Sequence, residues 1–184
     1  MQAEAALAAT RAWVEQAVIG LNLCPFAKAV QVKGLVRYEC SSARDTEALR
    51  ADLRDELQRL EAAPIEALET TLLVHPWVLQ DFLDYNDFLD EADALLAELG
   101  LEGVLQVASF HPQYQFAGTA PDDIENATNR SPFPTLHLLR EDSIARAVQA
   151  FPEAEAIYET NMHTLRALGP EAWAQLQARC LRGG

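Results

Sequence analysis

The sequence has little positive charge. It contains 14 lysine and arginine residues against 28 aspartate and glutamate residues, which gives a formal net charge of -14. Proteins that bind duplex nucleic acid need clustered basic residues to displace counterions, and anionic membrane surfaces attract the same residues. The composition therefore argues against nucleic acid and membranes as partners. An anionic small ligand would need a local arginine that acts against the field of the whole chain.

Paired cysteines and nucleotide-binding motifs are also lacking. Cys24, Cys40 and Cys180 form no Cys-x-x-Cys pair, which excludes a zinc ribbon and a dithiol redox motif and favours free thiols in a reducing compartment. There is no Gly-x-Gly-x-x-Gly, P-loop, flavin signature or His-Glu-x-x-His. No nucleotide cofactor is therefore indicated, and a divalent metal stays open as a cofactor.

Long apolar runs are missing as well. No run approaches the roughly 20 residues that a membrane-spanning helix needs. The first residues carry Glu4 and Glu15 and only Arg11 as a cation, a polarity opposite to that of a secretory signal, so we expect a cytoplasmic protein. With 184 residues, of which 49% are apolar, the chain predicts a single domain over 1–184.

What is present is an alternation of helical and strand patterns. Apolar spacing predicts helices over 3–22, 79–99, 143–150, 153–168 and 170–181, and a further helix from a cap at Ser42 to Pro64. β-prone runs predict strands over 36–40, 70–75, 103–111 and 135–139. The expected class is α/β or α+β, with one small mixed, partly parallel sheet of about four strands covered by helices and a helical C-terminal segment.

Two of these strands end in the same way, at His75-Pro76 and His111-Pro112. If the two strands are parallel neighbours, both histidines emerge at the carboxyl edge of the sheet, where open α/β sheets bind ligands. We therefore predict His111 and His75 as acid/base groups, with Asp123 fixing a histidine or a metal-bound water. The alternative is that each histidine is structural and bonded to a backbone carbonyl.

The segment from Pro112 to Pro134 shows no convincing element of its own, and long loops in compact domains are often functional. It contains Arg130 between Asn129 and Ser131, stiffened by prolines, which is typical of an anion-binding corner. The predicted substrate-binding residues are Arg130, Asn129, Ser131, Gln115 and the mid-strand His137. Alternatively, Arg130 pairs with Asp122 or Asp123 and only holds the loop, and His137 is a core residue.

Cys24 is the thiol with a candidate role. A cysteine and a histidine can act as nucleophile and base, and Cys24, His75 and His111 together are a candidate metal-ligand set that leaves a position open. The alternative is that Cys24 is a small buried hydrophobe, as most free cysteines are.

Three segments carry a resemblance: Leu-Asn-Leu-Cys-Pro-Phe-Ala at 21–27, Ser-Phe-His-Pro-x-Tyr-Gln-Phe-Ala-Gly-Thr at 109–119, and Asn-Arg-Ser-Pro-Phe-Pro-Thr-Leu-His-Leu-Leu-Arg-Glu at 129–141. With these segments the chain resembles the bacterial family catalogued as domain of unknown function 1415, over nearly its whole length. The resemblance implies the extent of the domain and a bacterial cytosolic location, and it implies no activity.

The leading hypothesis is a small-molecule enzyme, hydrolytic or group-transferring and open to metal assistance, with its site at the carboxyl edge of the sheet. A second hypothesis is a non-enzymatic protein that binds a metal or a ligand. A third is a protein-interaction module in which the histidines are structural. The sequence leaves the oligomeric state open.

Overall fold

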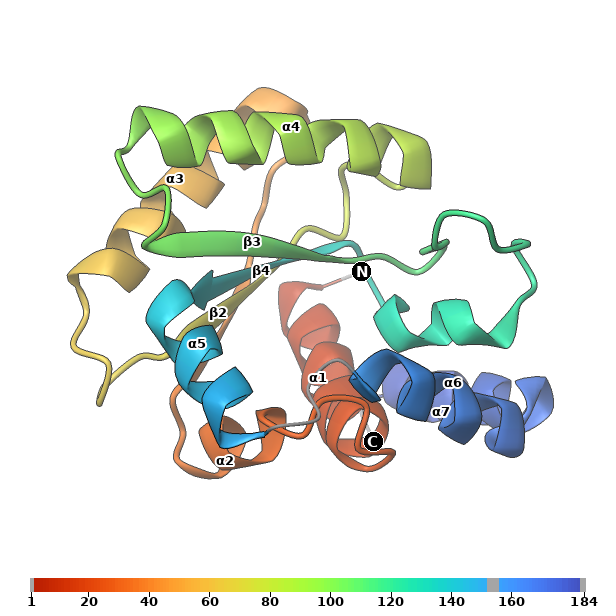
Figure 1. The fold of residues 1–184 in the computed structure, drawn as a ribbon. Helices are drawn as coiled ribbons and strands as arrows, with labels where there is room; N and C mark the ends of the chain where they lie inside the picture. Colours follow the sequence, from red (N-terminus) through yellow and green to blue (C-terminus); the bar gives the residue numbers. More distant parts are fainter. Residues whose placement is uncertain (1, 152–155, 183–184) are drawn as a thin grey trace.

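The architecture is a four-stranded sheet with helices on both faces (Figure 1). The computed structural model describes residues 2–151 and 156–182. The spatial order of the strands is β1-β2-β4-β3, with bounds β1 (Val36–Cys40), β2 (Thr70–Val74), β3 (Leu105–Phe110) and β4 (Thr135–Arg140). The predicted α/β class with a mixed sheet and C-terminal helices is confirmed.

Strand directions correct one expectation about the sheet. β1 and β2 pair in parallel, whereas β4 is antiparallel to both β2 and β3. The condition that the strands at 70–75 and 103–111 are neighbours is therefore not met, because β4 lies between them. Two strands that are antiparallel to the same strand run in the same direction, so β2 and β3 still end at one edge of the sheet.

One face of the sheet is covered by α3 (Thr46–Ala62) and α4 (Phe82–Glu98) (Figure 1). The leucine stripe of α3 is fully buried in this core and packs with alternate residues of the strands, such as Leu73, Leu136 and Leu138. Period-two alternation sends the residues between them to the other face of the sheet.

Both helices begin at an aspartate cap. The Asp45 side chain accepts a hydrogen bond from the backbone N–H of Ala48 at 2.8 Å, and Asp81 accepts one from Leu83 N–H at 2.8 Å. The predicted cap at Ser42 is wrong, because the residue that caps α3 is Asp45, three residues later. α4 begins later than residue 79 because Leu79 has a left-handed backbone with φ of 57°.

The other face is covered by α1 (Ala3–Trp13), α5 (Glu141–Ala150) and α7 (Pro170–Leu181) (Figure 1). Trp13 and Trp173 are buried there with Tyr38 and Leu72 of the sheet. α6 (Ile157–Leu168) contacts a 3-10 helix, η2 (Ile124–Asn129), that the sequence did not predict. Residues 153–155 of the predicted helix lie outside the described residues. None of the described helices combines the length and apolar character that a membrane crossing requires.

The predicted helix over 3–22 changes its winding before it ends. α1 continues into a π-helix, η1 (Val14–Ile19), and the short helix α2 (Ala27–Val32) follows after a turn. Gly20 closes the π-helix, and a Cβ there would lie 2.2 Å from the carbonyl oxygen of Gln16. Only glycine fits this close approach, and π-turns often mark functional sites.

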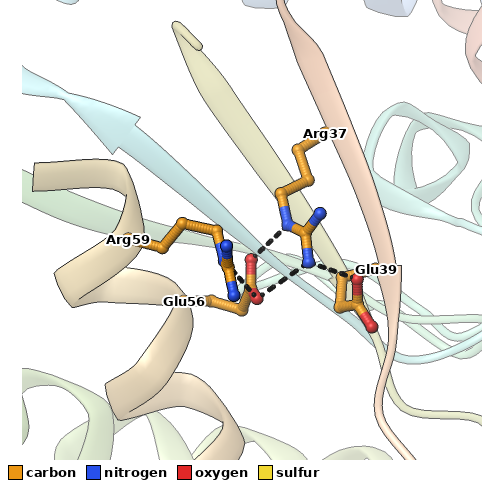
Figure 2. Close-up of polar contacts among 4 residues, drawn as sticks. All are labelled: Arg37, Glu39, Glu56 and Arg59. Atoms are coloured by element: carbon orange, nitrogen blue, oxygen red, sulfur yellow. Dashed lines mark hydrogen bonds and ion pairs between the residues drawn. The ribbon is translucent and has the colours of Figure 1, made fainter. Parts of the chain in front are cut away.

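An ionic cluster joins the edge strand β1 to α3 (Figure 2). Arg37 donates from Nε and Nη2 to the two carboxylate oxygens of Glu56 at 2.7 and 3.1 Å, and Nη2 also lies 2.5 Å from Glu39. The Glu56 side chain is 7% exposed, while that of Arg59, which donates to it at 3.2 Å, is 56% exposed. The bidentate pair with Arg37 is thus the inner part of the cluster.

Candidate functional site

A cavity of about 390 Å³ lies between the sheet and the helices on the face covered by α1 and α5. Its floor is made of residues that alternation directs to this face of the strands, among them Thr70, Ala108 and His137. Its walls come from the end of α1, the π-helix, the turn at Cys24, α2 and α5. The lining is overwhelmingly apolar, as in most small-molecule sites.

Aromatic rings form one side of this cavity. The Trp13 and Phe110 rings meet edge to face with centroids 5.0 Å apart, and the centroids of Phe110 and His137 are 5.7 Å apart. Phe26 lies before α2 and meets Phe151, directly after α5, at a centroid distance of 6.0 Å. Neither α2 nor α5 contains a buried residue, so these two wall helices are the less firmly packed part of the cavity.

His137 is held in one tautomer by its partner Thr70. The Thr70 hydroxyl donates to the carbonyl oxygen of Leu138 at 2.6 Å, and His137 Nε2 lies 2.8 Å from the same hydroxyl oxygen. A hydroxyl has a single proton to donate, so Nε2 carries a proton and donates to Thr70. Nδ1 is then an unprotonated acceptor, and it has no hydrogen-bond partner among residues 2–151 and 156–182.

The surroundings of His137 also set its charge. Burial lowers the pKa of its imidazole to about 4, because the apolar lining does not solvate the charged form. The ring is therefore neutral at pH 7. His137 lines the cavity, and its Nδ1 is not among the fully buried polar atoms without a partner. The cavity thus presents an accessible, uncharged hydrogen-bond acceptor on a mostly apolar surface.

Few other polar groups border the cavity. Cys24, Glu69, Gln106 and Ser143 are among its lining residues, and the described lining contains no lysine or arginine. Cys24 and His137, predicted separately from the sequence, are brought to the same cavity. Cys24 is a partly exposed free thiol.

The two histidines at the sheet edge are occupied by backbone groups. His75 is fully buried, and its Nδ1 donates to the carbonyl oxygen of Val78 at 3.1 Å. His111 donates from Nε2 to the Leu79 carbonyl oxygen at 3.1 Å and accepts at Nδ1 from Gln113 N–H at 3.0 Å. This arrangement corresponds to the structural alternative for both rings.

Tyr85 lies between these two histidines. Its ring stacks on His75 with centroids 5.7 Å apart and meets His111 at 5.0 Å. Burial lowers the pKa of His75 to about 4 and also lowers the pKa of His111. Both rings are neutral at pH 7 and pack against Tyr85 of the core.

The predicted metal-ligand set is not assembled. Within 2–151 and 156–182, no group of three His, Cys, Asp or Glu side chains is placed to hold a metal ion. Cys24 borders the cavity, whereas His75 packs against Tyr85 in the core beneath α3 and α4. The two predicted ligands therefore belong to different faces of the sheet.

The predicted anion corner is used to hold its own loop. Arg130 donates to the carbonyl oxygens of Tyr114 at 3.1 Å and Pro121 at 2.5 Å, so it fixes the loop through backbone groups rather than through Asp122 or Asp123. Burial lowers the pKa of Arg130. The guanidinium has its partners within the loop.

The other residues predicted in this loop have backbone partners too, and none of them lines the cavity. Asp123 accepts from Ala120 N–H at 2.8 Å, Asn129 donates to the Ser109 carbonyl at 3.2 Å, Ser131 donates to that of Phe133 at 2.6 Å, and Gln115 donates to that of Thr119 at 2.5 Å. Each of these groups closes a turn or joins the loop to β3.

A family model described as a protein of unknown function (DUF1415) matches residues 5–175. The chain belongs to the DUF1415 family. No curated protein and no solved structure matches the chain. The matched residues of this DUF1415 chain include all those that line the cavity.

Trp13, Thr70 and Phe110 of this DUF1415 member line the cavity but were not among the residues predicted from the sequence. A signal was present for two of them, because alternation places Thr70 and Phe110 on one face of their strands. No local pattern shows that this face is left partly uncovered, since that depends on how α1, α2 and α5 pack.

Proposed function

We propose that this protein binds a small, mainly apolar molecule in the cavity between the sheet and α5, with His137 making the polar contact. The proposal is supported by His137 Nδ1, an acceptor atom that has no hydrogen-bond partner among the described residues, together with the mainly apolar cavity of about 390 Å³ that His137 lines. Small-molecule sites commonly combine such a lining with one or two polar groups that fix orientation. The proposed site thus lies on a face of the sheet and not at the sheet edge that the sequence favoured.

A pair of adjacent positions on α5 tests the proposal. Ala147 lines the cavity, whereas Val148 is 48% exposed and does not line it. The probe is N-phenyl-1-naphthylamine, an uncharged dye whose fluorescence rises in apolar surroundings. We expect saturable binding to the wild type and to Val148→Trp, and binding at least about tenfold weaker to Ala147→Trp, whose indole fills the cavity. Equal binding to both variants would show that the dye binds outside the cavity, and it would contradict the proposal.

A second candidate is an enzyme of the hydrolytic or group-transfer class at the same cavity. It is favoured by one observation: Cys24 and His137 both line the cavity, and a thiol and an unprotonated imidazole nitrogen are the groups of a nucleophile and its base. Turnover of p-nitrophenyl acetate that is lost in both Cys24→Ala and His137→Gln supports this candidate. Turnover that survives in either variant contradicts it.

We also propose a bacterial cytoplasmic location and a small-molecule partner. The family resemblance and the free cysteines Cys24, Cys40 and Cys180 support a bacterial cytoplasmic protein. The net charge of -14 supports a small-molecule partner over nucleic acid or an anionic membrane.

A further inference from the structure

We infer that the molecule bound in this cavity is an uncharged ring compound that carries a hydroxyl or N–H group and donates its proton to Nδ1 of His137. This inference rests on the proposed function and adds the chemical class of the ligand. Three features of the described residues carry it: the tautomer of His137, the charges around the cavity, and the shape of its aromatic wall.

The first feature is the direction of the hydrogen bond. Because the Thr70 hydroxyl donates its proton to the Leu138 carbonyl oxygen, His137 Nε2 must donate to Thr70. Nδ1 is therefore left as an acceptor. An acceptor that meets another acceptor gains nothing and loses its hydration, whereas a donor satisfies it. The matching group on the ligand is therefore a hydroxyl or N–H.

The second feature is charge. Glu69 is a lining residue, the described lining contains no lysine or arginine, and the chain has a net charge of -14. A carboxylate or phosphate would lose its hydration without gaining a cation partner. Arg130, the residue predicted to bind an anion, donates to the backbone of its own loop instead. The lining, which contains Glu69 and no cation among its described residues, therefore excludes anionic ligands.

The third feature is shape. Trp13, Phe110 and His137 form a row of rings in which each neighbouring pair lies within 5.7 Å, centroid to centroid. Aromatic rings attract further rings in edge-to-face or offset geometry. A cavity of about 390 Å³ has room for a fused two-ring compound. The geometry therefore favours a ring body over a flexible chain, which would lose more conformational entropy on binding.

Three naphthalenes of similar size separate these features by calorimetric titration. 2-Naphthol has the donor, 2-fluoronaphthalene replaces it with a group of similar size that has no proton, and 2-naphthoate is an anion. We expect 2-naphthol to bind about three- to tenfold more tightly than 2-fluoronaphthalene, as one net hydrogen bond predicts. We expect 2-naphthoate to bind most weakly. In His137→Phe the first two should bind alike.

The wild-type protein provides a test that does not depend on a variant that folds. Long-range proton–nitrogen NMR spectra should show His137 as the Nε2–H tautomer, and the Nδ1 resonance should move on addition of 2-naphthol but not of 2-fluoronaphthalene. A proton on Nδ1 in the free protein would overturn the inference.

The remaining outcomes are distinguishable. Equal affinities of 2-naphthol and 2-fluoronaphthalene for the wild type would overturn the donor assignment while leaving the cavity as a binding site. Tighter binding of 2-naphthoate would overturn the exclusion of anions. Failure of all three compounds to bind, together with N-phenyl-1-naphthylamine, would overturn the proposed function as well.

Discussion

At the scale of single residues, the four histidines differ because of what surrounds each ring. His111 has protein partners on both nitrogens, and His75 has one on Nδ1 and none on Nε2 within the described chain. His137 has Thr70 on one nitrogen and a cavity beside its ring. His163 is exposed on α6. Residue type alone therefore did not indicate which histidine is available to a ligand.

The lowered pKa values of His75 and His137 predict a stability that falls in mild acid. The folded-state pKa of both His75 and His137 is lowered from 6.5 to about 4. Between these values the unfolded chain binds more protons than the folded chain, so acid favours unfolding. The stabilising contribution is fully present above pH 6.5 and is lost as the pH falls toward 4.

Urea unfolding at pH 7 and pH 5 measures this effect. We expect the free energy of unfolding to fall by about 1 to 2 kcal/mol for each of the two rings between these values. His137→Gln should lose its share of the pH dependence, whereas His163→Gln, at an exposed position, should retain all of it. Identical pH dependence in the two variants would show that His137 titrates normally in the folded protein.

At the scale of elements, helix caps show where a sequence pattern and the structure disagree. Ser42-x-x-Asp45 matches a capping pattern, yet the Asp45 side chain itself caps α3. We expect Asp45→Ala to lower the free energy of unfolding by about 1 kcal/mol, because it leaves a helix N–H without its partner. Ser42→Ala should change it by less than about 0.5 kcal/mol, since Ser42 is an exposed residue outside the helix. The reverse order, measured by urea unfolding, would restore the sequence prediction.

The connection between β1 and α3 gives a second prediction at this scale. Glu56→Gln removes the charge that meets Arg37 through two hydrogen bonds in a side chain only 7% exposed. We expect a loss of about 2 kcal/mol in the free energy of unfolding. Arg59→Gln removes a 56% exposed partner of the same carboxylate and should cost less than about 1 kcal/mol. Equal losses would mean that the cluster acts as a surface network and does not join strand to helix.

The extent to which the elements could be predicted follows from local chemistry. β1 and α7 have the predicted bounds, because strict alternation and a proline at the first helical position are local signals. The π-helix, α2 and η2 were not predicted. These are short elements within segments whose apolar pattern belongs to a longer helix or to a loop, and their form depends on packing such as that between η2 and α6.

At the scale of the whole molecule, the position of the candidate site was the least predictable feature. Strand ends drew attention to His75 and His111, and those strands do end at one edge of the sheet. The cavity instead lies on a face of the sheet and is closed by segments as far apart as Trp13, Cys24 and Ala147. Such a space depends on the packing of distant helices, which a pattern within one element does not encode.

Two cysteines allow a test of whether a ring compound binds in this cavity. Cys24 lines the cavity, whereas Cys40, on the edge strand β1, is a partly exposed thiol that does not line it. The most direct measurement is the rate at which N-ethylmaleimide alkylates each cysteine, by mass spectrometry of the folded protein, with and without saturating 2-naphthol. We predict that bound 2-naphthol slows the alkylation of Cys24 and leaves the rate at Cys40 unchanged. Equal rates at Cys24 with and without bound 2-naphthol would contradict it.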